Sequence, residues 1–387
     1  MTLDDFTVAE IDTGETTIFV RHAGRGPGTL LLHGFPETHL MWRGVAPLLA
    51  QSSTVVCADL RGYGYSGCPP SAADHRPYSK RAMARDMVAA MEMLGHRRFS
   101  VVGHDRGGRV AYRMALDHPD RIERLGVLDV VPIESAWERA DARFALAFWP
   151  WSLLAQSEPL PERVLTATAD LLVDHALSEW GSPAAGFSPA IRAAYIEALR
   201  DSAHAHAICE EYRAAATIDR KHDREDRAAG RRITCPLLVL WSANGPLATW
   251  YTGESGPIGL WREWADDVRG QALNGGHFFP EEIPEQTVEA LGRFFAFWDL
   301  DLLKRDELIA EVKKLRAGIR AHRDSTKHEL CWHHPHLWGL LPEKVEPEIA
   351  VPAWPQFLRG CLRYRESLDQ QLPKAPRVTE EFEKPPT

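Results

Sequence analysis

The chain has 387 residues, of which 44% are hydrophobic, so it can bury a sizeable core and hold a main domain with one or two additions. Its formal net charge of −9 excludes a broad basic surface, and we therefore expect no nucleic-acid partner. The sequence MTLDDFTVAE lacks the basic residues of a signal peptide, and no segment has membrane-spanning length, so we expect a cytoplasmic protein with no membrane partner.

The first third of the chain alternates short apolar runs with amphipathic segments. Because strands that alternate with helices form parallel sheets with helices on their faces, this order predicts an α/β fold with a mostly parallel sheet. The predicted strands are residues 16–20, 29–35, 53–60, 99–105 and 124–131, and the predicted helices are residues 79–94 and the segment that starts at Gly107.

The pattern changes after Pro132 to a long block of helical signals with no evident strand. Strand character returns at 236–245 and at 271–279. We therefore expect a helical cap to be inserted over the carboxyl ends of the strands, where open α/β sheets bind ligands. The predicted division is residues 1–132 and 233–298 for the α/β core and 133–232 for the cap.

Residues 299–387 are predicted to form a C-terminal extension of unknown role, with a polar tail that is disordered. Four apolar residues repeat here at steps of three and four, which indicates a packing seam. We expect this seam to dock on the core or on a second subunit, and in the second case the protein would be a homodimer. The seam consists of Leu308, Val312, Leu315 and Ile319.

The same extension holds the one cluster of residues that suggests a metal site. Its members crowd into one short segment without a matching second pair of ligands, so we interpret them as solvated or packing residues and expect neither a metal nor another cofactor. The cluster is Cys331, His333, His334 and His336.

The segment FSVVGHDRGGR, residues 99–109, places an aspartate at the turn between a strand and a helix. Glycines on both sides let a strained turn close, so that Asp105 stands at the end of the strand. A carboxylate in this place attacks saturated carbon and forms an ester that water must cleave, whereas a serine would attack carbonyl carbon. The elbow therefore points to cleavage of a carbon–halogen or epoxide carbon–oxygen bond.

Three other segments supply what such a reaction needs. The turn HGFP can point the N–H of Phe35 at a developing oxyanion, and the N–H of Arg106 is the second expected donor. His277, in GGHFFPEE, is expected to be the general base for water. Asp129 follows the strand after the elbow and can hold the imidazole in the required tautomer.

These residues also have other interpretations. Asp129 could cap the helix that opens the cap, in which case Asn244 or a neighbouring group could take the acid position. Asp59 is expected to stabilise its own glycine-rich turn, and His104 to be a packed or hydrogen-bonded neighbour rather than a second base.

Arg106 and Arg109 begin the helix that follows the elbow, so both can reach the neighbourhood of the nucleophile. The planar guanidinium group binds both oxygens of a carboxylate, and the helix N-terminus adds positive potential. The pair predicts a clamp for a substrate carboxylate. One of the two arginines could instead pair with a neighbouring acid, and Arg109 is the better candidate for that structural role.

Together, the motifs HGFPETHLMW, DLRGYGYSG, PYSKRAMARDM, GHDRGGRVAYRMALDHP, LDVVP, EEYRA and GGHFFPEE resemble the fluoroacetate or haloacetate dehalogenases of the α/β-hydrolase superfamily. The resemblance covers roughly residues 5–297 and implies an α/β-hydrolase fold with a helical cap. It implies that Asp105 is the nucleophile, His277 the base and Asp129 its partner, and that Arg106 and Arg109 grip the substrate carboxylate.

The family also holds the departing halide with a histidine, a tryptophan and a tyrosine from the cap. Trp151 and Tyr212 match the last two, but this chain has Pro150 where the family has histidine. Proline has no side-chain donor, and fluoride, the poorest leaving group, depends most on such donors.

We therefore predict hydrolytic dehalogenation of small 2-haloacids to 2-hydroxy acids through an aspartyl ester, with chloroacetate or bromoacetate favoured over fluoroacetate. The expected partners are the haloacid and water. An alternative is an epoxide hydrolase that uses the same nucleophile and base with lid tyrosines, for which Tyr212 and Tyr195 are the candidates. A third is a non-catalytic sensor or scaffold in which the extension is the working part.

Overall fold

The computed structural model describes residues 1–181 and 187–296, and beyond these only scattered positions between 305 and 362. The chain divides into two compact units, residues 1–298 and 299–387, of which the first holds all the elements named below. In the extension, Leu308 is half-buried and Val312 and Leu315 are exposed, and docking of this seam stays a prediction. Ile319 and the predicted ligand cluster, Cys331, His333, His334 and His336, lie outside the described residues.

An eight-stranded sheet forms the centre of the first unit, with the strand order β1-β2-β4-β3-β5-β6-β7-β8. β2 pairs antiparallel with β1 and β4, and every other neighbouring pair is parallel. The fold is therefore the expected α/β class with a mostly parallel sheet. The strands are β1 Thr7–Asp12, β2 Thr17–Ala23, β3 Gly28–Leu32, β4 Thr54–Ala58, β5 Phe99–His104, β6 Ile122–Leu128, β7 Leu237–Ser242 and β8 Val268–Leu273.

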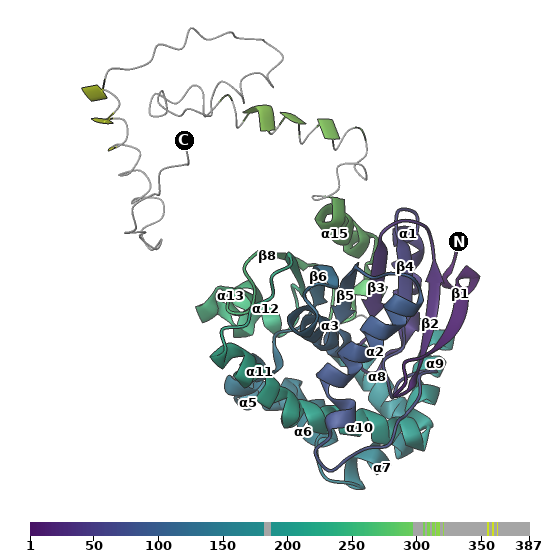
Figure 1. The fold of residues 1–387 in the computed structure, drawn as a ribbon. Coiled ribbons are helices and arrows are strands. Elements are labelled where there is room, and N and C mark those ends of the chain that lie inside the picture. Colours follow the sequence, from purple (N-terminus) through teal and green to yellow (C-terminus); the bar gives the residue numbers. More distant parts are fainter. Residues whose placement is uncertain are drawn as a thin grey trace. The chain divides into compact units, whose positions relative to one another are not determined.

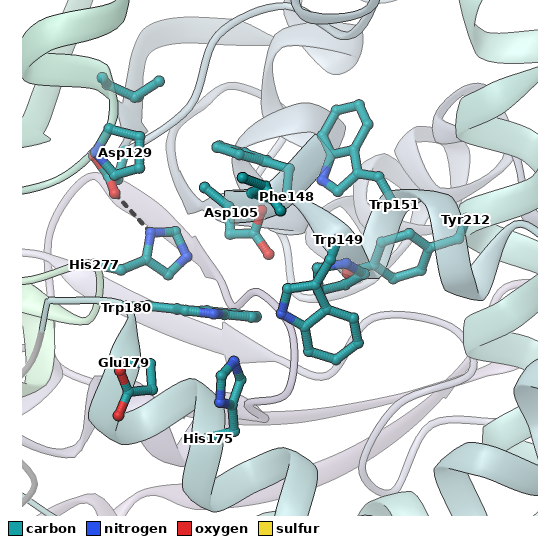
Figure 2. A pocket seen from close by; sticks show the side chains of 15 residues that line it. Asp105, Asp129, Phe148, Trp149, Trp151, His175, Glu179, Trp180, Tyr212 and His277 are labelled. Atoms are coloured by element: carbon teal, nitrogen blue, oxygen red, sulfur yellow. Dashed lines mark hydrogen bonds and ion pairs between the residues drawn. The ribbon is translucent and has the colours of Figure 1, made fainter. Parts of the chain in front are cut away.

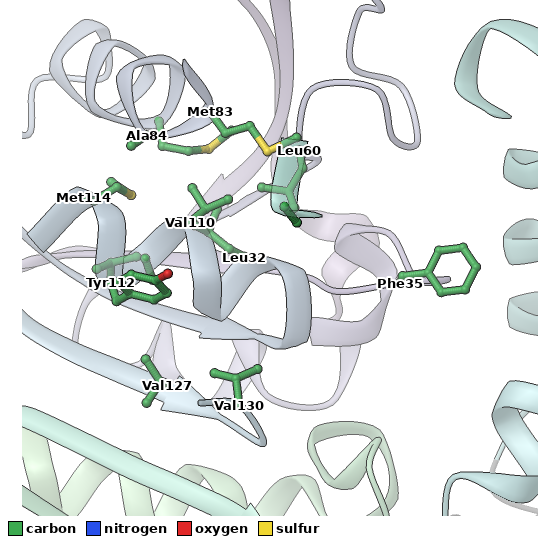
Figure 3. Packing of buried hydrophobic residues seen from close by; sticks show 14 of the residues in the cluster. Leu32, Phe35, Leu60, Met83, Ala84, Val110, Tyr112, Met114, Val127 and Val130 are labelled. Atoms are coloured by element: carbon green, nitrogen blue, oxygen red, sulfur yellow. The ribbon is translucent and has the colours of Figure 1, made fainter. Parts of the chain in front are cut away.

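Helices cover both faces of this sheet (Figure 1). Along β3, Leu30 and Leu32 join the hydrophobic cluster that includes α2 and α3, whereas Leu31 joins the cluster on the other face with α1 and α15. Figure 3 shows side chains of the first cluster, with the ring of Phe35 set apart from the others on its loop. The core helices are α1 Ala46–Leu49, α2 Lys80–Met93, α3 Asp105–Asp117, α12 Leu247–Trp250, α13 Gly256–Arg262, α14 Phe279–Glu282 and α15 Pro284–Ala296, with 3-10 helices η1 Leu3–Asp5, η2 His39–Arg43, η3 Arg76–Tyr78 and η5 Thr252–Glu254.

Residues 133–232 contain helices and no strand where the structure describes them, and these helices lie together on one side of the sheet (Figure 1). We call this segment the cap. Residues buried in it, such as Trp151, Leu165 and Tyr212, belong to the same hydrophobic cluster as the core residues Val110 and Val130. The cap helices are α4 Ile133–Glu138, α5 Ala142–Ala147, α6 Trp149–Leu154, α7 Leu160–Ala167, α8 Ala169–Glu179, α9 Pro189–Arg200, α10 Ser202–Ala216 and α11 Ile218–Ala228.

Several elements differ from the sequence prediction: β8 ends at Leu273 although strand character was predicted over 271–279, and the short helices α1 and α13 were not expected. β1 was not expected, because it is an edge strand whose residues, apart from Ile11, are exposed or half-buried, so it lacks a strong hydrophobic pattern. The helix after the elbow begins at Asp105 itself rather than at Gly107. The candidate nucleophile is thus the first residue of α3.

Candidate active site

Asp105 lies at a sharp turn between β5 and α3 and has a φ of +41°, a conformation that residues with a side chain rarely adopt. The turn depends on close backbone approaches. A Cβ atom at Gly103 would lie 2.3 Å from the carbonyl oxygen of Gly107, and one at Gly107 would lie 2.4 Å from that of His33. A Cβ atom at Gly34 would lie 2.6 Å from the Cβ of Asp105. These glycines hold the carboxylate where the strand ends.

Each carboxylate oxygen of Asp105 accepts a different donor. The backbone N–H of Phe35 donates to Oδ2 at 3.2 Å, and Nη1 of Arg109 donates to Oδ1 at 2.6 Å. Burial by itself raises the pKa of Asp105, but Arg109, followed by His277 and Arg106, outweighs burial and lowers the pKa far below its usual range. These cationic neighbours therefore favour the ionised carboxylate, which is the form that can act as a nucleophile.

The side chains of His277 and Asp129 lie within hydrogen-bond distance of each other, the contact that was predicted from the sequence. His277 lies in the loop after β8, and its Nδ1 is 2.6 Å from Oδ2 of Asp129. The other oxygen of Asp129 accepts the N–H of Ser242 at 3.0 Å, and Asp129 has a φ of +52°. Figure 2 shows the imidazole between Asp129 and Asp105. Both oxygens of Asp129 are thus engaged here rather than at the start of α4, and Asn244, the alternative acid position, is exposed.

The buried side chain of His104 is hydrogen-bonded to the loop that carries His277. Nδ1 of His104 is 3.0 Å from Oε2 of Glu37, and its Nε2 is 2.8 Å from the backbone oxygen of His277. Because both ring nitrogens face acceptors, both carry hydrogen and the imidazole is charged. Burial lowers the pKa of His104, but the charge of Glu37 and the hydrogen bond to it outweigh burial and raise the pKa. His104 is thus the hydrogen-bonded neighbour that was expected, while the role of Glu37 was missed.

The two arginines are placed differently from the predicted clamp. Nε of Arg106 donates to Oε2 of Glu211 at 2.8 Å, and its Nη2 donates to Oε1 at 2.5 Å. Two of the three nitrogens of this guanidinium group are thus already bonded to a carboxylate of the cap. Arg109, the better candidate for a structural role, is the one that bonds the nucleophile. Each arginine keeps one buried N–H group without a partner, Nη1 of Arg106 and Nε of Arg109. Glu211, although part of the EEYRA motif, was not foreseen as a partner.

A cavity of about 270 Å³ opens over Asp105 (Figure 2). Its walls combine the candidate catalytic residues of the core with aromatic side chains of the cap. The lining residues are Asp105, Asp129, Leu146, Ala147, Phe148, Trp149, Pro150, Trp151, His175, Glu179, Trp180, Tyr212, Pro246, Leu247 and His277.

Trp151 and Tyr212, the residues expected around a leaving halide, both line this cavity together with Pro150. The guanidinium carbon of Arg109 lies 4.6 Å from the ring centroid of Trp151, and that of Arg106 lies 4.0 Å from the ring centroid of Tyr212. Such contacts hold the aromatic rings and the arginines together, so the positive potential of the guanidinium groups lies beside both rings.

Two further candidates lie outside the cavity. The hydroxyl of Tyr195 donates to Oε1 of Glu281 at 2.9 Å, and Tyr195 is fully buried away from the cavity lining. Asp59 accepts the N–H groups of His39 and Tyr65 at 2.7 and 3.0 Å, so it stabilises the glycine-rich turn, as expected.

A second group of polar residues lies in the cap. Ligand atoms of Glu158, Glu162 and His206 lie within 4.8 Å of one another. However, Nη2 of Arg213 donates to Oε1 of Glu162 at 2.6 Å, so this carboxylate already has a cationic partner. The cluster is therefore an ion-pair network.

Among the described residues, no helix is both long and apolar enough to cross a membrane.

Comparison with known proteins gives consistent matches. A family model described as the alpha/beta hydrolase fold matches residues 30–255. A fluoroacetate dehalogenase from Burkholderia sp. is 44% identical over 74% of this chain and 92% of its own length. A soluble epoxide hydrolase from Corynebacterium sp. (strain C12) is 32% identical over 71% of this chain and 92% of its own length. A solved alpha/beta hydrolase structure from Nostoc sp. PCC 7120 has a TM-score of 0.73 and 45% identity and covers 76% of this chain and 99% of that one.

Proposed function

The chain belongs to the alpha/beta hydrolase fold family and is a hydrolase, and from this premise we propose that it cleaves the carbon–halogen bond of 2-haloacids through an ester on Asp105. One observation carries the proposal. An ionised aspartate at the elbow faces a histidine that a second aspartate orients, with an arginine bonded to the nucleophile itself. The similarity to a fluoroacetate dehalogenase supports the same reaction.

In the first step, a carboxylate oxygen of Asp105 bonds to the carbon that carries the halogen. The carbon–halogen bond breaks, and its electron pair leaves with the halide. Arg109 and Arg106 are the proposed partners of the substrate carboxylate, because among the described residues Nε of Arg109 and Nη1 of Arg106 have no hydrogen-bond partner. Trp151 and Tyr212 each offer one polar hydrogen to the departing halide.

In the second step, water attacks the side-chain carbonyl carbon of Asp105, and His277 accepts the proton. The N–H of Phe35, which already bonds Oδ2, stabilises the oxyanion, together with the N–H of Arg106, the first residue after the nucleophile. The bond between the carbonyl carbon and the bridging oxygen then breaks as His277 gives its proton to that oxygen, and the 2-hydroxy acid leaves with an oxygen that came from Asp105, whose new carboxyl group ionises. No step requires a metal or organic cofactor.

The substitution at Pro150 sets the expected halogen preference. Pro150 is buried in the cavity wall beside Trp151 and offers no donor to a halide. Loss of one donor to a developing anion costs about 2.7–4 kcal/mol in an oxyanion hole. We expect chloroacetate and bromoacetate to react faster than fluoroacetate.

The test is release of ions and product from chloroacetate. The protein should yield chloride and glycolate in equal amounts, and the Asp105→Asn variant should yield neither. A single turnover in ¹⁸O-water should label Asp105 and leave the glycolate hydroxyl unlabelled. Label in the glycolate alone would mean direct hydrolysis and would refute the ester.

Epoxide hydrolysis is the second candidate, because Tyr212 lines the cavity and a soluble epoxide hydrolase is among the relatives. That reaction would use a lid tyrosine to protonate the opening oxygen. Tyr195, the candidate for a second lid tyrosine, instead donates its hydroxyl hydrogen to Glu281. Styrene oxide assayed beside chloroacetate separates the two: turnover of the epoxide alone would favour this candidate.

A further inference from the structure

The cavity over Asp105 is larger than a two-carbon acid requires. An engineered cavity of about 150 Å³ in another protein binds benzene, so a cavity of about 270 Å³ exceeds what a two-carbon acid needs. Unless other groups fill the remaining space, the substrate is held only at its carboxylate end.

The surplus space is bounded by apolar side chains on the cap side. Phe148, Trp149 and Trp180 line it, together with Leu146 from α5 and Leu247 from α12. Figure 2 shows Trp149 and Trp180 between Asp105 and His175, so a group attached to the reacting carbon can extend toward them. Walls of this composition favour an apolar substituent over water.

These aromatic walls are held in place by their own neighbours. Phe148 stacks on Phe144 with ring centroids 5.2 Å apart, and Trp180 stacks on Phe278 at 5.8 Å. The carbonyl of Trp180 also accepts the backbone N–H of His277 at 2.9 Å. A wall anchored in this way stays open instead of collapsing onto a small substrate.

Pro150 enlarges the same space on the leaving-group side, because its ring is smaller than an imidazole and makes no polar contact with a halide. The site thus combines an anionic nucleophile, with Arg109 bonded to it and Arg106 packed against the ring of Tyr212, and an apolar chamber above Asp105. The chemistry of its ligand follows from that division: a carboxylate at one end and a bulky apolar group near the reacting carbon.

We infer that, given the proposed function, the site is built for 2-haloacids that carry an aryl or branched alkyl group on the halogen-bearing carbon. The bond changes are those of the proposed reaction: the carbon–halogen bond breaks with release of halide, and a bond to an oxygen of Asp105 forms on the opposite face. The product is a 2-hydroxy acid of inverted configuration. Because the cavity walls are chiral, one enantiomer reacts preferentially.

The first experiment measures binding without turnover. Titration calorimetry compares phenylacetate with acetate on the intact chain. We expect phenylacetate to bind roughly thirtyfold more tightly, as burial of one aromatic group predicts. Equal affinities would overturn the inference, because the chamber would then contribute nothing to recognition.

The second experiment measures turnover as chloride release from chloroacetate, 2-chloropropionate and 2-chloro-2-phenylacetate, each normalised to its uncatalysed rate. We expect kcat/KM to rise along this series. Ala147, an exposed residue of the cavity wall, offers a filling variant, and Ala145, exposed on the same helix outside the wall, offers its control. Ala147→Trp should lower the preference for the phenyl acid by about tenfold, and Ala145→Trp should leave it unchanged.

The outcomes separate the two proposals. If chloroacetate is turned over and the larger acids are not, or if Ala147→Trp leaves the preference unchanged, the substrate class is wrong and the dehalogenase assignment stands. If phenylacetate binds tightly but no haloacid releases chloride, the proposed function fails while the chamber's ligand chemistry is retained.

Discussion

The core and the cap contribute different kinds of groups to one cavity. Asp105, Asp129 and His277 come from loops at the strand ends of the core and are fixed by hydrogen bonds of 2.6–3.2 Å. The cap supplies five aromatic side chains to the cavity lining: Phe148, Trp149, Trp151, Trp180 and Tyr212. The core thus supplies the groups of the proposed reaction, and the cap bounds much of the space that a substrate can occupy. Substitutions in the core should therefore change the rate of the proposed reaction. Substitutions in the cap should change the preference among substrates or the attachment of the cap to the core.

The largest effect is expected from replacing His277, the proposed general base, which belongs to the core. His277→Gln removes the acceptor of the water proton but leaves Asp105 intact, so the ester should form and persist. Steady-state halide release should fall by about 10²–10⁴-fold, and mass spectrometry should detect the protein with the acyl group attached. The matched control is His204→Gln in the cap, where the half-buried imidazole contacts Asp201 and does not line the cavity. An unmodified protein after incubation with chloroacetate would contradict the separation of the two steps.

The next largest effect concerns the contact between core and cap. Glu211 on α10 is fully buried and pairs with Arg106 on α3 and with Lys80 on α2. Glu211→Gln leaves the buried guanidinium group of Arg106 without its countercharge, so the free energy of unfolding should fall by about 3–5 kcal/mol. Denaturant unfolding measures this.

The control for that variant is Glu225→Gln on α11, where an exposed carboxylate lies 3.8 Å from Lys221. Its loss should change stability by less than about 0.5 kcal/mol. If the two variants were equally stable, the buried pair would not be what fastens the cap to the core.

A pH-dependent effect is expected from Glu37, which is fully buried beside His104. The pKa of His104 is raised in the folded protein, so the pair contributes its full stability below the unfolded pKa near 6.5 and loses it as pH rises through the folded pKa. Glu37→Gln should cost about 2 kcal/mol at pH 6 and less at pH 9. Unfolding curves at both pH values test this, and a cost that grows with pH would be evidence against a charged His104.

The smallest effect tests selectivity from the cap. Pro150 is the second residue of α6, where a histidine side chain can be accommodated without loss of a helical hydrogen bond. Pro150→His should raise the ratio of fluoroacetate to chloroacetate turnover by about tenfold, because fluoride gains a donor. Pro150→Ala, which adds no side-chain donor, is the control. A similar gain in both variants would assign the effect to space rather than to hydrogen bonding.

Much of the core was predictable because each part has a local cause. Glycines on both sides of Asp105 indicate a tight turn, and apolar runs before Phe35 and Asp105 predict the strands that position them. The order of strands and helices likewise predicts the sheet. The contact between His277 and Asp129 followed from their places after two strands of that sheet.

The cap was less predictable, because its contacts join residues far apart in the sequence. Helical periodicity identifies α8 and α10 but does not reveal that Trp180 reaches the loop of His277, or that Glu211 captures Arg106. The prediction that both arginines clamp the substrate did not include the carboxylate of Glu211, because Glu211 lies far from Arg106 in the sequence. The resemblance supplied Trp151 and Tyr212, whereas Trp149 and Trp180 carried no local signal.

The loop that carries His277 is held from two sides. Its backbone oxygen accepts a hydrogen bond from His104 in the core, and its backbone N–H is bonded to the carbonyl of Trp180 in the cap. Any departure of the cap therefore releases the amide proton of His277, the proposed general base. Hydrogen–deuterium exchange at that single amide would time the opening of the lid, and its slowing on ligand addition would report closure independently of any product formed.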